Sequence, residues 1–145
     1  MKNILVAIDF RGKDHLLLNE AHKLASKFEA KVWFIHIAAP DPDFVGLKVG
    51  PQYIRDTRAE DLRKEHKMIQ EYADKFTKEG IAADGLMVQG PTTDMIVNEA
   101  KKLNIDLIIT GYQEHNFFYK VLYGSVTNHI IKASKIPIMV IPLDE

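Results

Sequence analysis

The residues best suited to chemistry lie in the last quarter of the chain, within residues 105–142. An apolar run ends there at Gly111, and the pair Gly124-Ser125 precedes an amphipathic run. A glycine after a buried strand lets the backbone approach a ligand closely, and a glycine-serine pair before a helix directs backbone N–H groups at an anion. These segments predict a phosphate-binding loop, into which the sequence also places the carboxylate of Glu114.

The charge of Glu114 sets a limit on that prediction. A favourable charge at a helix N-terminus contributes about 0.3–1 kcal/mol. A carboxylate a few ångström from a phosphate costs a similar amount or more where the two are partly buried. Glu114 therefore offsets the contribution that the helix start makes to phosphate binding.

The composition indicates one domain that covers residues 1–145. Of the 145 residues, 46% are hydrophobic and 27% are charged, as in a soluble protein with one core. The net charge of −1 does not favour nucleic acid or an anionic membrane, and the lack of cysteine excludes disulfides and thiolate metal sites. The first apolar run is too short for a signal peptide or a membrane span. We therefore expect a cytoplasmic protein with no nucleic-acid or membrane partner.

Apolar and amphipathic runs alternate along the chain. Strands are predicted at residues 2–9, 31–37, 83–89, 105–110 and 136–141, and helices at residues 14–28, 56–79, from about Pro91, and at about 126–133. This alternation, with continuously apolar strands, is typical of an open parallel sheet covered by helices on both faces. The last strand, Ile136 to Ile141, is expected at an edge, where pairing with a second copy of the chain would protect it.

This architecture gathers the residues that could bind a nucleoside. Ligands of open α/β sheets bind beyond the carboxyl ends of the strands, where the strand order reverses. With the first and fourth strands adjacent, Asp9 would lie at that crevice and accept hydrogen bonds from ribose hydroxyls or a base amine. Ile37 and Ala38, at the end of the second strand, would form a wall against the base.

The phosphate end of the same crevice would be built from backbone groups. Gly111 would give a phosphate access to the backbone, and Gly124, Ser125 and Val126 would present N–H groups at a helix start. Structural explanations are equally open. Gly111 could serve a turn with positive φ, Ser125 could be an N-cap, and Asp9 could cap a turn or the first helix.

Over essentially its whole length the sequence resembles the universal stress proteins. The resemblance rests on the segments ILVAIDF, FIHI, QGPTTDMI, DLIITG and GSVTNHIIKASKIPIMVIP. Nucleotide-binding members of that family carry a G-x2-G-x9-G-[S/T] loop. This chain keeps the spacing and three of the four marked positions, with Glu114 in place of the second glycine.

The resemblance implies a flavodoxin-like, adenine nucleotide alpha hydrolase-like α/β fold with strand order 3-2-1-4-5. It also implies a stress-response role and a homodimer formed through the last strand. Some members bind ATP or related nucleotides and others do not. Glu114 and the bulky residues Phe117, Phe118 and Tyr119 depart from the glycine-rich loop of binders. A ligand with fewer phosphates, such as AMP or a cyclic nucleotide, would avoid Glu114.

The sequence contains no recognisable catalytic or metal site. It has no G-x-S-x-G elbow and no G-x4-G-K-[S/T] loop, and its six histidines show no i,i+4 pair. His36 is expected to be a hydrogen-bonded core residue, and His66 is expected at the edge of the apolar face of the second helix. We therefore expect a non-enzymatic protein that requires no cofactor.

Three functions remain open at this point. The chain could be a sensor whose loop is ordered by a weakly bound nucleotide such as ATP or AMP. It could instead be an interaction module with an empty cleft, whose loop aromatics and edge strand contact other proteins. The third alternative is slow nucleotide hydrolysis, for which the sequence offers no phosphate-gripping lysine.

Overall fold

The computed structural model describes residues 1–38, 52–90, 92–112 and 129–143 of the chain. Its strands are β1 (Asn3–Ala7), β2 (Lys31–Ala38), β3 (Ala83–Gln89), β4 (Leu107–Tyr112) and β5 (Ile138–Pro142). Its helices are α1 (Asp14–Phe28), α2 (Gln52–Lys78) and α3 (Thr92–Lys102), and residues 129–134 are also helical. Strands and helices thus alternate as the sequence predicts.

The five strands form one parallel sheet in the order β3-β2-β1-β4-β5, which confirms the predicted order. β1 lies in the middle, where it pairs with β2 on one side and with β4 on the other. A central strand of this kind is buried on both faces, and the side chains of Ile4, Leu5, Val6, Ile108 and Ile109 are fully buried. This burial explains the continuous apolar stretches within β1 and β4.

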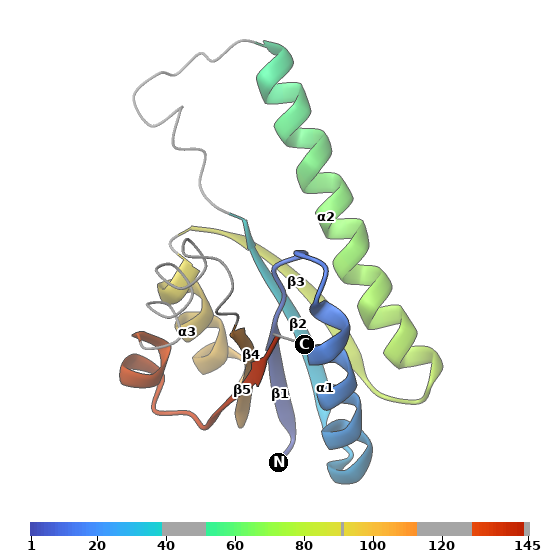
Figure 1. Ribbon diagram of the computed structural model, residues 1–145, viewed down its shortest axis with the longest axis vertical. Coiled ribbons are helices and arrows are strands. Elements are labelled where there is room, and N and C mark those ends of the chain that lie inside the picture. Colours follow the sequence, from blue (N-terminus) through green and yellow to red (C-terminus); the bar gives the residue numbers. More distant parts are fainter. Residues whose placement is uncertain (39–51, 91, 113–128, 144–145) are drawn as a thin grey trace.

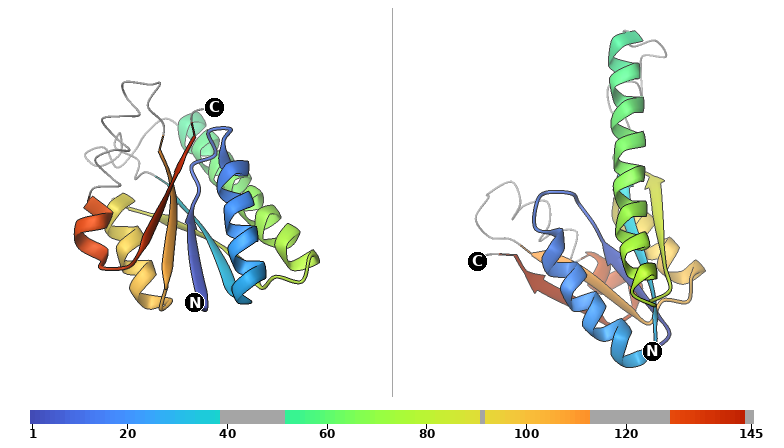
Figure 2. Two further views of the ribbon diagram at one scale, coloured as in Figure 1. Left: turned by 60° about the horizontal axis from the view of Figure 1, so that its bottom comes forward. Right: turned by 90° about the vertical axis from the view of Figure 1, so that its right-hand side faces the viewer.

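Two helical layers enclose the sheet (Figures 1 and 2). α1 and α2 cover one face, and α3 with the helical residues 129–134 covers the other. Successive residues of a strand point to opposite faces, so each face has its own core cluster. Ile4 and Val6 pack with Phe34 and Phe76 on the α1/α2 side, whereas Leu5 belongs to the cluster on the α3 side. None of the helices in the described ranges has the length and apolar character that a membrane span requires.

Several element boundaries differ from the sequence-based prediction. β4 was expected at residues 105–110 and β5 from Ile136 to Ile141, but both begin and end later along the chain. The reason is that strand ends depend on pairing as well as on apolar runs. Ile108 pairs with Ile138 and Tyr112 with Pro142, while the N–H of Ile105 donates to the carbonyl of Ala100 at the end of α3. α2 also begins at Gln52 rather than at residue 56.

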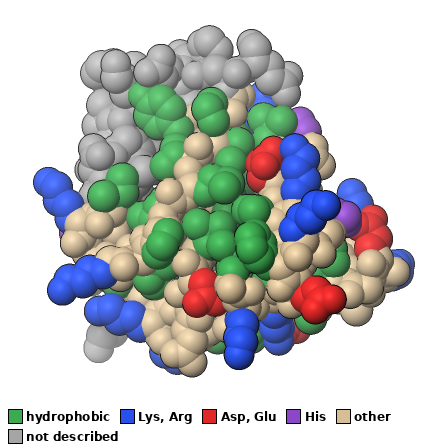
Figure 3. Space-filling model, turned by 90° about the horizontal axis from the view of Figure 1, so that it is seen from below, with side chains coloured by type: hydrophobic (Ala, Val, Ile, Leu, Met, Phe, Trp, Pro, Cys, Tyr) green, Lys and Arg blue, Asp and Glu red, His purple; other side chains and the backbone are tan. Residues whose placement is uncertain are grey.

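β5 is an edge strand, as predicted, and its edge is apolar. Val140 of β5 is 38% exposed, and Ile131 in the neighbouring helical segment is 54% exposed. β5 lies foremost in the left view of Figure 2. Figure 3 shows the molecule from below, with apolar side chains gathered at the centre of that face and charged side chains around them. An edge of this kind requires protection from indiscriminate strand pairing.

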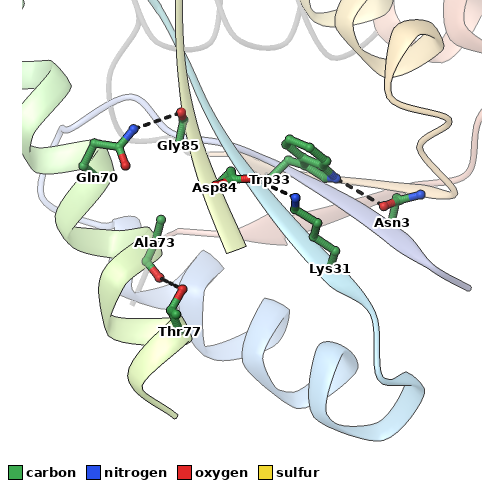
Figure 4. A network of polar contacts seen from close by, with 8 residues as sticks. All are labelled: Asn3, Lys31, Trp33, Gln70, Ala73, Thr77, Asp84 and Gly85. Atoms are coloured by element: carbon green, nitrogen blue, oxygen red, sulfur yellow. Dashed lines mark hydrogen bonds and ion pairs between the residues drawn. The ribbon is translucent and has the colours of Figure 1, made fainter. Parts of the chain in front are cut away.

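The strands are also linked by polar contacts near their amino ends (Figure 4). The ammonium of Lys31 lies 2.7 Å from a carboxylate oxygen of Asp84 and 3.9 Å from the ring centroid of Trp33. The indole N–H of Trp33 donates to the side-chain carbonyl of Asn3 at 3.2 Å. These contacts join β3, β2 and β1 on the face opposite α2.

Close contact with β3 fixes the height of α2 above the sheet. The Gln70 amide donates to the carbonyl of Gly85 at 3.2 Å, which Figure 4 shows at the left. A Cβ atom at Gly85 would lie 3.0 Å from the backbone carbonyl oxygen of Ile69. Helix and strand approach each other this closely because residue 85 has no side chain.

We predict that Gly85→Ala destabilises the protein by about 1–3 kcal/mol, because backbone atoms of α2 must move to admit the methyl group. Chemical denaturation, monitored by circular dichroism, measures the change. Asp84→Ala is the matched control, since its partly exposed ion pair with Lys31 contributes at most about 1 kcal/mol. Equal, small losses for the two variants would show that the contact between α2 and β3 is not tight.

Candidate functional site

The strand order places the candidate site at the carboxyl ends of β1 and β4. The order reverses at this point, since β2 and β3 lie on one side of β1 and β4 and β5 on the other. Val6 of β1 pairs with Ile109 of β4. Asp9, just after the end of β1, and Gly111, near the end of β4, therefore lie at the same edge of two adjacent strands. Open α/β sheets bind ligands at such a reversal, and the predicted adjacency of the first and fourth strands is confirmed.

Asp9 lies in the turn that connects β1 to α1. It is half-buried, and its Oδ1 accepts a hydrogen bond from the N–H of Arg11 at 2.9 Å. This is the turn-capping role that the sequence left open for Asp9. The first position before α1 is occupied by Lys13 and has no side-chain cap, so Asp9 does not cap the helix.

The next residue, Phe10, has an unusual backbone conformation. Its φ angle is 59°, in the left-handed region that bulky residues rarely adopt. Its ring lies 4.7 Å from the ring of His36 and 5.9 Å from that of Tyr72, between centroids. Strain of about 1–3 kcal/mol persists only where the surroundings hold the residue in place, and these two rings do so here.

His36 anchors the same turn to β2 and α2. Its Nδ1–H donates to the carbonyl of Ile8 at 2.8 Å, which confirms the expected hydrogen-bonded core histidine. Its Nε2 lies 3.2 Å from Oε2 of Glu65 on α2. Oε2 is buried and has no hydrogen-bond partner of good geometry among the described residues.

Asp14, the first residue of α1, is the buried acid of the site. Only 6% of it is exposed, and its Oδ2 accepts a hydrogen bond from the Tyr72 hydroxyl at 3.0 Å. Burial is the main cause that raises the pKa of Asp14, the Tyr72 hydrogen bond opposes it, and the charge of Asp9 raises it further. Burial and the Asp14 carboxylate also raise the pKa of the Tyr72 hydroxyl.

The sequence analysis did not identify Asp14, Glu65 or Tyr72. Glu65 and Tyr72 are seven residues apart, so both lie on the sheet-facing side of α2, close to the buried Ile69. Polar residues on the apolar side of an amphipathic helix are unusual, and this feature of the sequence could have identified Glu65 and Tyr72. In the sequence, Asp14 looks like any acid in the first turn of a helix. Only the structure shows its hydrogen bond with Tyr72, which lies 58 residues away along the chain.

Ile37 and Ala38 end β2 as predicted, but both already have partners within the protein. Ile37 packs against the core cluster on the α3 side, which includes Ile96. Ala38 is buried, and its carbonyl accepts the N–H of Gly90 at 3.4 Å. The structure accounts for both residues by packing, and their contact with a base stays a prediction.

Gly111 does not begin a turn, which corrects that part of the interpretation. It lies within β4, where it pairs with Ile141, and it has no positive φ. A Cβ atom at this position would lie 2.6 Å from Cδ1 of Leu143. Glycine is therefore required here because the buried Leu143 side chain fills the adjacent space.

The remaining predicted residues lie outside the described part of the chain. These are Glu114, Gly124, Ser125 and Val126, together with the loop aromatics Phe117, Phe118 and Tyr119. Within residues that the structure does describe, no group of three or more His, Asp or Glu side chains is placed to hold a metal ion. His66 is exposed, and it lines a groove with Met87 and Gln89.

Comparison with known proteins identifies the family. The model of the universal stress protein family matches residues 1–142. The chain belongs to this family. Universal stress protein C of Salmonella typhimurium is 29% identical over 97% of this chain and 95% of its own, and the universal stress protein YxiE of Bacillus subtilis is 23% identical over 95% and 97%.

Solved universal stress proteins share the fold. One from Archaeoglobus fulgidus superposes with a TM-score of 0.71 at 20% identity, over 97% of this chain and 98% of its own. A universal stress protein in complex with cAMP gives a TM-score of 0.67 at 17% identity, over 99% and 98%. A universal stress protein from A. fulgidus in complex with dAMP also gives a TM-score of 0.67, at 20% identity over 97% of this chain and 98% of its own. At these identities the likeness establishes the five-stranded α/β architecture.

We predict a non-additive interaction between residues 111 and 143. Gly111→Ala should destabilise the protein by about 1–3 kcal/mol through overlap with Leu143, and Leu143→Ala by about 2–5 kcal/mol through loss of a buried side chain. The double variant should lose less than the sum, because the new methyl group occupies part of the space that Leu143 vacates. Urea denaturation of the four proteins without ligand measures this difference. Strict additivity would contradict the packing role of Gly111.

Proposed function

We propose that this universal stress protein binds an adenine nucleotide weakly at the carboxyl ends of β1 and β4, and acts as a non-enzymatic regulatory module. The observation that carries the proposal is the position of Asp9. It follows the central strand at the point of strand-order reversal, in a half-buried turn that other residues hold in place. Relatives with the same architecture have been solved with cAMP and with dAMP.

Each proposed contact follows from the chemistry of the residues. The Asp9 carboxylate would accept hydrogen bonds from ribose hydroxyls or from a base amine, and such charge-assisted bonds contribute about 1.5–3 kcal/mol each. The backbone around Ile37 and Ala38 would bound the base. Gly124, Ser125 and Val126 would supply N–H groups to a phosphate, as the loop spacing suggests.

Glu114 makes the proposed cleft a degenerate one that favours few phosphates. The carboxylate replaces a glycine of the nucleotide-binding loop, so it adds a negative charge where the ligand is also negative. Repulsion grows with each phosphate, and we therefore expect AMP or a cyclic nucleotide to be bound in preference to ATP. We favour a regulatory role over hydrolysis, because the sequence has no G-x4-G-K-[S/T] loop whose lysine would bind the phosphates during phosphoryl transfer.

The exposed edge of β5 favours a second candidate function, that of an interaction module. Val140 exposes apolar surface on β5, the last strand of the sheet in the described part of the chain, and Ile131 does so in the neighbouring helical segment. Pairing of β5 with β5 of a second copy would cover it, and such a homodimer is self-complementary about a two-fold axis. In this alternative the cleft is empty, and the edge strand and loop aromatics provide the functional surface.

The nucleotide proposal is tested by isothermal titration with ATP, ADP, AMP and cAMP. We expect AMP or cAMP to bind more tightly than ATP. Glu114→Gly should tighten ATP binding by about twofold to tenfold, and Glu114→Gln by less, because glutamine removes the charge but keeps the side chain. The absence of heat with all four ligands at high micromolar protein would refute the proposal. Unchanged ATP affinity in Glu114→Gly would show that this side chain does not face the phosphates.

The dimer is tested by light scattering coupled to gel filtration. We expect a dimer mass for the natural sequence at micromolar concentration. Val140→Lys should shift it toward the monomer, because a lysine on an edge strand opposes pairing. Phe28→Lys is the matched control, since Phe28 is 52% exposed but lies at the end of α1. A monomer mass for the natural sequence, or equal dissociation in both variants, would argue against pairing through β5.

A further inference from the structure

β3 ends the sheet on the side opposite β5, and one side of its backbone faces away from the other strands. The N–H of Val32 donates to the carbonyl of Ala82 at 2.9 Å, so residue 82 points its backbone groups toward β2. Successive residues of a strand direct their N–H and C=O groups alternately to its two sides. Gly85, Met87 and Gln89 therefore direct theirs away from β2.

Gln70 of α2 closes this outer side of β3 at one point. Its side-chain amide donates to the outward carbonyl of Gly85 at 3.2 Å (Figure 4), where helix and strand are in close contact. A groove of about 440 Å³ lies further along the strand. It is lined by Leu62, Arg63 and His66 of α2 and by Met87 and Gln89 of β3.

The groove combines apolar surface with a fixed positive charge. Leu62 and Met87 are half-buried and supply the apolar surface, and Arg63 is exposed. None of the described residues that line the groove is acidic. A guanidinium group binds a carboxylate through two parallel N–H groups. The groove is therefore complementary to a carboxylate that lies beside an apolar side chain.

The charge of Arg63 distinguishes this edge from that of β5. Val140 and Ile131 make the β5 edge apolar, which suits a second copy of the chain. Two β3 strands paired about a two-fold axis perpendicular to the sheet would place both α2 helices on the same face and bring two Arg63 side chains to one junction. Like charges oppose such pairing. The charge therefore favours a segment of another protein over a second copy.

We propose that the groove between α2 and β3 binds a short extended segment of a partner protein, which adds a strand to β3 and places a carboxylate against Arg63. The backbone of the segment pairs with Met87 and Gln89, as in other sheets that are extended by a peptide. Alternate residues of a strand face the same way, so the segment carries an acidic and an apolar residue two positions apart. The apolar side chain lies against Leu62 and Met87. This inference does not depend on nucleotide binding.

The first test needs no partner. Amide hydrogen exchange of the full chain, followed by NMR, should be faster at Met87 than at Leu86. The reason is that the backbone groups of Leu86 point toward β2, whereas those of Met87 point away from it. Equal protection of the two amides would show that another segment of this chain or a second copy already covers the edge, and would overturn the proposal.

Binding is tested with acetylated and amidated peptides that carry the expected pattern. TETVTVT, TETLTLT and TETITIT are titrated into the nitrogen-15-labelled full chain, and TKTVTVT is the matched control. The acidic peptides should shift the amide signals of residues 62–66 and 87–89 and slow exchange at Met87 several-fold, whereas TKTVTVT should do neither. The absence of shifts at these residues with all three acidic peptides at millimolar concentration would overturn the proposal.

Strand addition is tested separately by methylating the peptide backbone. Only alternate N–H groups of an added strand face β3. Two forms of the tightest-binding peptide are therefore made, one N-methylated at its odd and one at its even positions. One form should lose binding and the other should retain it. An equal effect of the two methylation patterns would rule out pairing with β3.

Substitutions in the protein test the charge and the edge. Arg63→Glu should weaken binding of the acidic peptides by about tenfold and allow TKTVTVT to bind. Lys78→Glu is the matched control, since Lys78 is exposed at the other end of α2, and it should leave the affinity unchanged. Met87→Pro removes only an outward N–H, which an edge strand tolerates, so it should keep the fold and lose binding. Equal weakening by Arg63→Glu and Lys78→Glu would show general attraction to positive charge and overturn the proposal.

Discussion

Parallel pairing between β1 and β4 is the constraint on which the candidate site depends. About one hundred residues separate the two strands along the chain, and their pairing alone brings the turn after β1 beside the end of β4. β1 has hydrogen-bonded neighbours on both sides and fully buried side chains on both faces. A shift of one residue in its register would turn every side chain to the opposite face. The position of Asp9 is therefore set by the centre of the sheet.

A second layer of contacts determines the shape of the turn itself. Phe10 retains its left-handed backbone because the His36 and Tyr72 rings enclose its side chain. Tyr72 belongs to α2, whose height above the sheet depends on its close approach to Gly85 of the edge strand β3. These contacts form a continuous path from an edge strand to Asp9. Physical continuity permits energetic coupling between the two places but does not by itself establish it.

The architecture could be predicted from the sequence, but the contacts within the β1–α1 turn could not. Strand type, strand order and the edge position of β5 follow from continuous apolar runs, from helical spacing and from the family resemblance, and these are local or whole-chain signals. The extent of β4 was wrong because it depends on pairing with β5. The turn that was one explanation of Gly111 was wrong, because this glycine lies within β4, where Leu143, 32 residues later, fills the space beside it. Contacts of this kind have no local sequence pattern.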